Sequence, residues 1–362
     1  MKLSNLLFAS LAVFAMIGCE SPNEGGDTTS GYTLMVDKQV IEASGTDVAT
    51  FTVIDANGVD VTADPAMKNK IYFEDQYGTI IKDGINTFAA YKNGTWTFVA
   101  KVKGVRSHNT VTVTAQNRKE YEKFLHKICI YQCTGTWCGY CPEMTKALDK
   151  VREGVNKDNV IVLACHGSTQ GAKDPYAIPY GEGTDLGNAV GAKFSYPGFP
   201  FAVYDLKFGN IKRTVAYIDG YIETLYKDEA ARCGVKITKA QIDADGNGTI
   251  EASVKAQYAG DYDLAWAVLV DNLPRQGGNE GSYSDTVVAV SDNFMGMSDE
   301  SKVTLAADQE YTKTFTFKVA PISGATLKPS DCKVVVMAHN EDIVDNANSC
   351  AVGSSVGYIY NE

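Results

Sequence analysis

Two cysteines three residues apart are the residues whose types and spacing most directly suggest chemistry. They belong to the segment 134–142, TGTWCGYCP, which follows a short apolar run at 128–131. We expect a strand at that run and a helix over 138–153, so that Cys138 lies where the helix begins. Backbone N–H groups and the helix dipole favour a thiolate at such a position. Cys138 is therefore the candidate nucleophile, and Cys141, one turn later, is the candidate thiol that resolves a mixed disulfide.

Two other interpretations of this cysteine pair remain open. A zinc site would need two further ligands, and the four histidines, at positions 108, 126, 166 and 339, are scattered singly. A structural disulfide would need no reactivity, and an oxidising compartment would permit it. We expect no cofactor and no metal.

Residues 243–248, DADGNG, imitate the start of a calcium loop, but Val254 stands where a bidentate Glu is needed, so we predict a polar hairpin turn.

The N-terminus predicts export and a lipid anchor. Lys2 precedes an apolar stretch over 6–17 that is too short to span a membrane and is typical of a signal peptide at 1–18. The stretch ends in MIGC, which is similar to a bacterial lipobox, so Cys19 is predicted to carry the lipid. Residues 19–31 are polar and rich in Gly and Ser, as expected of a linker. The membrane is thus expected as a partner through this anchor.

The remaining chain is predicted to be multidomain and not to bind nucleic acid. A net charge of -11 and the lack of a long basic run argue against a nucleic-acid partner. Short alternating strands over 32–116 resemble an immunoglobulin-like β-sandwich. Strands and helices alternate over 120–232, which predicts a central α/β domain. Strands return over 233–362 and predict a C-terminal β-sandwich.

A later proline connects the central region with a known fold. A strand, then WCGYCP at 137–142 opening a helix, then GFP at 198–200 before another strand, resembles the thioredoxin fold. This thioredoxin-like resemblance implies that Pro200 is a cis-proline that faces the cysteines and docks an extended substrate backbone. We also expect Trp137 to cover the site. The Gly-Tyr pair between the cysteines is similar to that of periplasmic disulfide isomerases.

The arrangement also resembles a narrower group, the outer membrane protein 28-related lipoproteins of Gram-negative bacteria. The matching segments are TGTWC at 134–138, ACHG at 164–167 and EDIVDNA at 341–347. The resemblance runs from about residue 121 to the C-terminus. It implies a lipid-anchored place in the cell envelope, at the outer membrane, and brings no well-established activity.

One departure from the thioredoxin pattern concerns proton transfer. Many thioredoxins place a buried carboxylate six residues before the nucleophile, where this chain has Gln132. A proton relay would then need Glu143 or a water molecule, or turnover would be slow. His166 is expected at the end of a strand near the cysteines, where it either tunes the thiolate or is simply solvated.

Further cysteines suggest a structural disulfide. Cys332 and Cys350 flank a hairpin-like segment and are candidates to pair, and Cys233 is an alternative partner for either. Cys129 and Cys133 would lie about 13 Å apart on an extended strand. That separation exceeds the roughly 7 Å between Cα atoms that a disulfide allows.

These features predict a membrane-anchored thiol–disulfide oxidoreductase or isomerase. Its partners would be protein disulfides or a redox partner protein. The alternative is a non-catalytic surface lipoprotein that uses a thioredoxin fold as a binding or adhesion scaffold, since β-sandwich modules commonly present binding surfaces.

Overall fold

The computed structural model describes residues 31–361, apart from 82–83, 91–92, 119–121, 229–230 and 276–280. The predicted signal peptide at 1–18, the lipidation site Cys19 and the linker up to residue 30 lie outside the described residues. Within the described part, no helix has both the length and the apolar character that crossing a bilayer requires.

The N-terminal part consists of two β-sheets that share one aromatic core. One sheet has the order β1-β3-β6 and the other the order β2-β9-β7-β4-β5, with β8 paired to β7. Strict alternation of buried and partly exposed residues along β3 turns Phe51 inward, where its ring centroid lies 4.8 Å from those of both Phe73 and Phe98. The bounds are β1 Thr33–Val36, β2 Val40–Glu42, β3 Ala49–Ile54, β4 Ile71–Asp75, β5 Ile80–Ile81, β6 Thr87–Phe88, β7 Gly94–Val102, β8 Val105–Arg106 and β9 Val111–Gln116.

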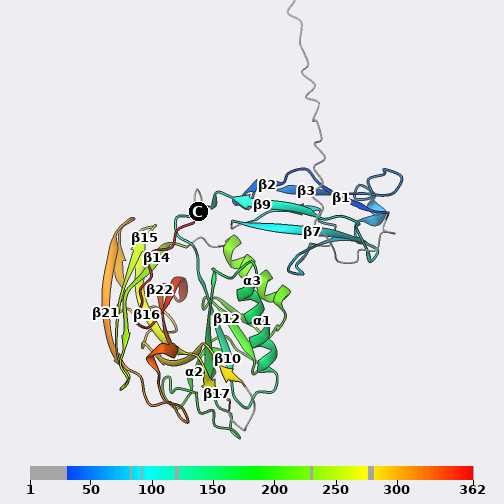
Figure 1. Cartoon of the computed structure of the whole chain (residues 1–362). Helices are drawn as coiled ribbons and strands as arrows, with labels where there is room; N and C mark the ends of the chain where they lie inside the picture. Colours follow the sequence, from blue (N-terminus) through cyan, green and yellow to red (C-terminus); the bar gives the residue numbers. More distant parts are fainter. Residues whose placement is uncertain are drawn as a thin grey trace, which may run out of the picture.

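The rest of the chain is built around one nine-stranded mixed sheet (Figure 1). Its order is β13-β12-β10-β11-β19-β16-β22-β23, and β20 pairs with β16 beside that path. β10 is parallel to β11 and antiparallel to β12, and β11 pairs in parallel with β19. The bounds are β10 Ile128–Thr134, β11 Val160–His166, β12 Phe201–Tyr204, β13 Phe208–Asn210, β16 Gly260–Val270, β19 Thr286–Val290, β20 Val303–Leu305, β22 Cys332–Asn340 and β23 Ile343–Ala351.

Both faces of the central strands are covered. All seven residues of β10 and all seven of β11 are buried, so neither strand has a solvent face. Ile128 and Ile130 pack against helices α1 and α3. Tyr131 and its neighbours on the opposite face pack against α2, β16, β22 and β23. The helices are α1 Cys141–Glu153, α2 Leu186–Lys193 and α3 Val215–Asp228.

A three-stranded sheet, β14-β15-β21, packs on the C-terminal part of the large sheet. The turn between β14 and β15 is the predicted polar hairpin, because the Asp243 carboxylate accepts the backbone N–H groups of Asp245 and Asn247 at 3.0 and 2.9 Å. The bounds are β14 Cys233–Ile242, β15 Asn247–Ala256 and β21 Glu310–Lys318, with a small pair of strands at β17 Leu273–Pro274 and β18 Ser282–Tyr283, and short 3-10 helices at Pro65–Met67 and Pro329–Asp331.

The predicted fold class, with a separate central thioredoxin-like α/β domain between two β-sandwiches, is wrong. The strands expected at 128–131 and 160–164 do form, but β11 continues the sheet into β19 through the pairing of Ala164 with Thr286. One core then contains Tyr131 from the expected central domain and Met337 from the expected C-terminal domain. The described chain is mainly β, with three α-helices among 23 strands. Alternation of strands and helices is a local pattern, and it does not reveal which distant strand will pair with the edge of β11.

A buried ion pair joins three strands at one end of the large sheet. Asp205 follows β12, and its carboxylate accepts the backbone N–H of Cys129 on β10 at 2.7 Å. The other carboxylate oxygen lies 3.2 Å from Nε2 of His126. The backbone carbonyl of Asp205 accepts the N–H of Val344 on β23 at 2.9 Å. Asp205 therefore connects β10 with β23, the first and last of these strands along the chain.

His126 is held in its charged form by this arrangement. Burial lowers its pKa, but the hydrogen bond and the negative charge of Asp205, with contributions from Glu122 and Asp345, outweigh burial and raise the pKa to about 9. Since this value lies above the unfolded-state value of about 6.5, the stabilisation is fully present below about pH 6.5 and is lost as the pH rises through 9.

We predict that the free energy of unfolding falls by about 3 kcal/mol between pH 6 and pH 10 because of His126. Urea unfolding at a series of pH values measures this. His126→Gln should remove that part of the decline, whereas His108→Gln, at an exposed histidine, should leave it in place. An unchanged pH dependence in His126→Gln would show that this ion pair does not stabilise the fold.

Candidate functional site

A disulfide bond joins Cys138 to Cys141 at the start of α1. The helix begins at Cys141, three residues later than predicted, and Tyr140 is its N-cap. The redox loop, which we define as residues 135–140, forms a turn before the helix, because the N–H of Cys138 donates to the carbonyl of Gly135 at 3.0 Å. Cys141 therefore occupies the first helical position, and Pro142 follows where a missing N–H costs little.

The two cysteine residues are both buried, and Cys138 is slightly the more exposed. Cys138 is 8% exposed and Cys141 is 3% exposed. Cys138 also lies outside the helix, whereas Cys141 is one of the buried residues of its inner face. The order of attack, with Cys138 first, stays a prediction.

Trp137 holds the redox loop against the segment that contains Pro200. Its ring stacks on Phe199 with centroids 5.5 Å apart and an angle of 17° between planes, and its Nε1–H donates to the carbonyl of Gly167 at 2.9 Å. The Phe199–Pro200 peptide bond is cis. A Cβ at Gly135 would lie 2.7 Å from Trp137 Nε1, so only glycine allows the indole to lie this close to the loop. The structure thus places Phe199, the residue before Pro200, against Trp137, the residue before Cys138.

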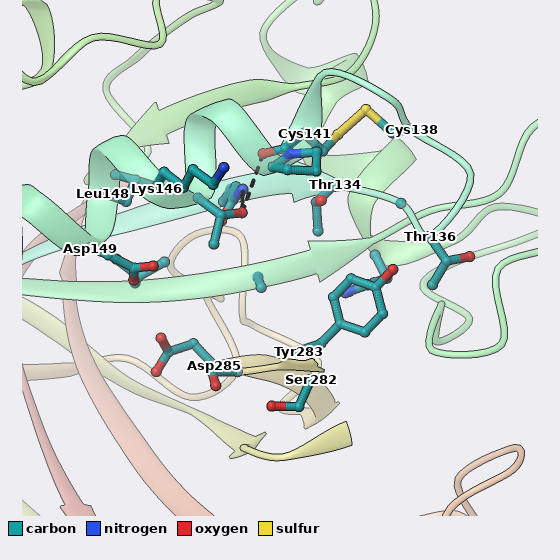
Figure 2. A pocket seen from close by; sticks show the side chains of 18 of the residues that line it. Thr134, Thr136, Cys138, Cys141, Lys146, Leu148, Asp149, Ser282, Tyr283 and Asp285 are labelled. Carbon is teal, nitrogen blue, oxygen red and sulfur yellow. Dashed lines mark hydrogen bonds between the residues drawn. A yellow bond between two sulfur atoms is a disulfide. The ribbon is translucent and has the colours of Figure 1, made fainter. Parts of the chain in front are cut away.

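A cavity of about 510 Å³ adjoins the disulfide. Figure 2 shows the bonded sulfur atoms on one side of this cavity, with Tyr283 and Asp285 on the opposite side. Its volume falls within the range of pockets that hold small ligands or single side chains of a larger partner. Its walls come from the end of β10, the redox loop, α1, the end of β11 and the segment before β19, and include Gln132, Thr134, Cys138, Cys141, Thr145, His166, Arg275, Tyr283 and Asp285.

Gln132, which stands where many thioredoxins have a carboxylate, and Glu143, the side chain considered for proton transfer, occupy different environments. Gln132 is 2% exposed, and its amide donates to Thr145 Oγ1 at 2.8 Å. That hydroxyl donates in turn to the carbonyl of Cys141 at 3.3 Å, so Gln132 connects β10 with the first turn of α1. The Glu143 side chain is 59% exposed and lies 3.3 Å from Arg213. The structure therefore places Gln132 behind the disulfide and Glu143 on the protein surface.

His166 is buried beside the redox loop and is not a solvated residue. Its Nδ1 lies 2.9 Å from Oδ2 of Asp174, and both side chains have 0% exposure. The same carboxylate oxygen accepts the N–H of Thr136 in the redox loop at 2.6 Å. The edge of the imidazole ring contacts Tyr176 and Tyr283. One oxygen atom of Asp174 thus couples His166 to the loop that carries Cys138.

Asp174 is the residue of this site that sequence analysis missed. Burial raises its pKa, but hydrogen bonds and charge from His166, with backbone N–H groups of Thr136 and Tyr176, outweigh burial and lower the pKa. Asp174 lies in a long loop without periodicity, and its role depends on contacts across the fold. A lone aspartate in a loop gave no signal by which to identify it.

The structure does not form the predicted disulfide between Cys332 and Cys350. Both thiols are free, because β22 and β23 place Cys350 opposite Val334 and not opposite Cys332. Cys233 is also a free, buried thiol. Cys129 and Cys133 do not bridge each other, as predicted. Among the described residues, no group of three or more His, Cys, Asp or Glu side chains is arranged to hold a metal ion.

Known proteins provide a relative in fold but no family. No protein-family model matches the chain, and no curated protein matches it. Among solved structures, the chain is similar to HBP35 of Porphyromonas gingivalis, with a TM-score of 0.51 and 21% identity over 64% of this chain and 77% of that one. A protein from Agrobacterium tumefaciens aligns over 64% of this chain and 96% of its own length, at 15% identity and a TM-score of 0.42. The first similarity is one of fold, and the second is too low to support an argument. The resemblance to outer membrane protein 28-related lipoproteins stays a prediction.

We predict that Asp174→Asn lowers the free energy of unfolding by about 3 kcal/mol, because it leaves the buried partners of one carboxylate oxygen without their acceptor. Urea unfolding measures the loss. Asp185→Asn is the matched control, since Asp185 lies in the same loop and accepts one backbone N–H, that of Ser168; it should cost about 1 kcal/mol. Equal losses of unfolding free energy in the two variants would show that the His166–Asp174 pair adds no stability beyond that of a single backbone hydrogen bond.

Proposed function

We propose that this chain is a thiol–disulfide oxidoreductase or isomerase whose reactive pair is Cys138 and Cys141. The observation that carries the proposal is the Cys138–Cys141 bond at the N-terminus of α1, with Cys138 outside the helix and a cavity beside the bond. When the bond is reduced, the helix N-terminus favours the thiolate form of Cys138 over the thiol.

The reaction is an exchange of two electrons between dithiol and disulfide. The Cys138 thiolate attacks one sulfur of a substrate disulfide, the substrate S–S bond breaks, and the leaving thiolate takes up a proton from water. The Cys141 thiol then loses its proton and attacks the Cys138 sulfur. This step re-forms the Cys138–Cys141 bond and releases the second substrate thiol. A dithiol, either a small molecule or a partner protein, must reduce the pair for another cycle.

The surroundings of the pair would guide a polypeptide substrate. Trp137 of the redox loop stacks on Phe199, and the two rings form an aromatic wall. We propose that an extended substrate segment lies along this wall and contacts the backbone at Pro200. Protein disulfides are therefore the proposed substrates.

We also propose that the protein acts in the cell envelope, where a lipid on Cys19 anchors it to the outer membrane. This part rests on the sequence alone: the apolar stretch at 6–17 and the MIGC pattern that ends it. An oxidising compartment of this kind is where disulfide chemistry has substrates.

A binding scaffold without catalysis is the second candidate. The observation in its favour is the low exposure of both cysteine residues, 8% for Cys138 and 3% for Cys141. A redox titration separates the candidates. A potential below about -300 mV would indicate a structural bond, whereas values near -180 to roughly -270 mV are typical of exchanging pairs.

We predict that Cys138→Ser abolishes the reduction of a protein disulfide by dithiothreitol above the uncatalysed rate. Cys141→Ser should instead accumulate a mixed disulfide between Cys138 and substrate, because the resolving thiol is missing. Mass spectrometry under non-reducing conditions detects that adduct.

Cys350→Ser is the control, since this free thiol lies on β23 and does not line the cavity. It should keep the full rate. Catalysis by Cys138→Ser at the rate of the unmodified protein would contradict the proposed function.

A further inference from the structure

Large apolar side chains are exposed in the redox loop and on both sides of Arg213, which contacts this loop through Tyr140. Trp137 is 37% exposed and Tyr140, between the two cysteines, is 63% exposed. Ile211, before α3, and Tyr217, in its first turn, are 51% and 53% exposed. Burying such side chains against a partner is favourable at roughly 25 cal/mol per Å² of apolar surface.

Two cations lie over the rings of this apolar group. The guanidinium carbon of Arg213 lies 5.1 Å from the ring centroid of Tyr140, and Nζ of Lys212 lies 4.9 Å from that of Tyr217. These contacts keep positive charge at the surface beside the aromatic rings. We call the whole set the cationic–aromatic patch; its members are Trp137, Tyr140, Ile211, Lys212, Arg213 and Tyr217.

The patch is fixed to the redox loop. Nε of Arg213 lies 3.3 Å from Oε2 of Glu143 in the first turn of α1, two residues after Cys141. Arg213 therefore contacts both the residue between the cysteines and the helix that follows them. Glu143 balances one positive charge of the patch, and Lys212 provides a second one.

The positive charge of the patch is opposite in sign to the net charge of the chain. The whole chain carries a net charge of -11, so an acidic partner is repelled by most of the surface. A local positive patch at the reactive bond is the place where acidic side chains would be accepted. Positive charge at the rim of a site selects partners and orients them more than it adds affinity.

We propose that the cationic–aromatic patch selects substrate polypeptides in which acidic and apolar residues flank the reactive cysteine. This inference rests on the proposed function, because the patch adjoins the bond that would react. A substrate sulfur at Cys138 brings its flanking residues over Tyr140, within reach of Arg213 and Lys212. Carboxylates pair with the two cations, and apolar side chains cover Trp137 and Tyr217.

The test uses two disulfide-linked peptides that differ only in the residues flanking the cysteine, Glu in one and Lys in the other. We expect kcat/KM to be about tenfold higher for the acidic peptide at low ionic strength. The preference should shrink to about twofold in 0.5 M NaCl, because salt screens exposed charges. Lys212→Glu/Arg213→Glu should reverse the preference, and the milder Lys212→Gln/Arg213→Gln should abolish it.

Lys103→Glu/Arg106→Glu is the matched control. It makes the same change of charge at two exposed residues of the N-terminal sheets, and it should keep the wild-type preference. Binding of a labelled peptide with Ser in place of Cys provides a readout that needs no chemistry, and it should show the same order of affinities.

The outcomes separate this inference from the proposed function. Turnover of both peptides at equal rates, or a preference that the two patch variants leave unchanged, would overturn the inference alone. Absence of turnover with either peptide, while the Ser-containing acidic peptide still binds to the patch, would overturn the proposed function. The patch would then remain a binding surface for acidic polypeptides. Binding of anionic vesicles or self-association through the patch, without preference for the acidic peptide, would overturn the proposed partner.

Discussion

Burial of both faces of β10 and β11 is the constraint on which the rest of this structure depends. Two adjacent strands with fourteen buried residues cannot stand alone, because each face must be covered by apolar side chains. Helices α1 and α3 cover one face. The other face is covered by α2 together with strands that arrive from the C-terminal third of the chain. These strands belong to the same large sheet as β10 and β11, so the sheet itself provides part of the apolar cover for the second face.

The same strands position the reactive pair. Parallel pairing of β10 with β11 places Thr134 opposite His166, so the segments that follow them meet at one edge of the sheet. The redox loop continues from Thr134, and the loop with Asp174 continues from His166. Hydrogen bonds between the two loops, from Thr136 to Asp174 and from Trp137 to Gly167, therefore join neighbours that lie about thirty residues or more apart in the sequence.

The histidine–carboxylate pairs and the pair at the redox loop differ in their exposure to solvent. His126 with Asp205 and His166 with Asp174 are sealed from solvent, so removing one partner leaves a buried charge or hydrogen-bonding group and costs stability. Arg213 with Glu143 is exposed to water and salt, so it contributes little to stability and can exchange partners. The buried pairs therefore belong to the framework, and the exposed pair belongs to a surface that a substrate could contact.

Sequence alone determined the local features of this protein: the cysteine spacing, the strand before it, and the inward face of α1 with Met144, Leu148 and Val151. These follow from residue type and period, which act over a few neighbouring positions. Tertiary structure decided the pairing of Ala164 with Thr286, the contact of Asp174 with His166 and the separation of Cys332 from Cys350. Each of these depends on which distant segments cover a buried face. Packing of the complete chain selects those segments, and no local pattern specifies them.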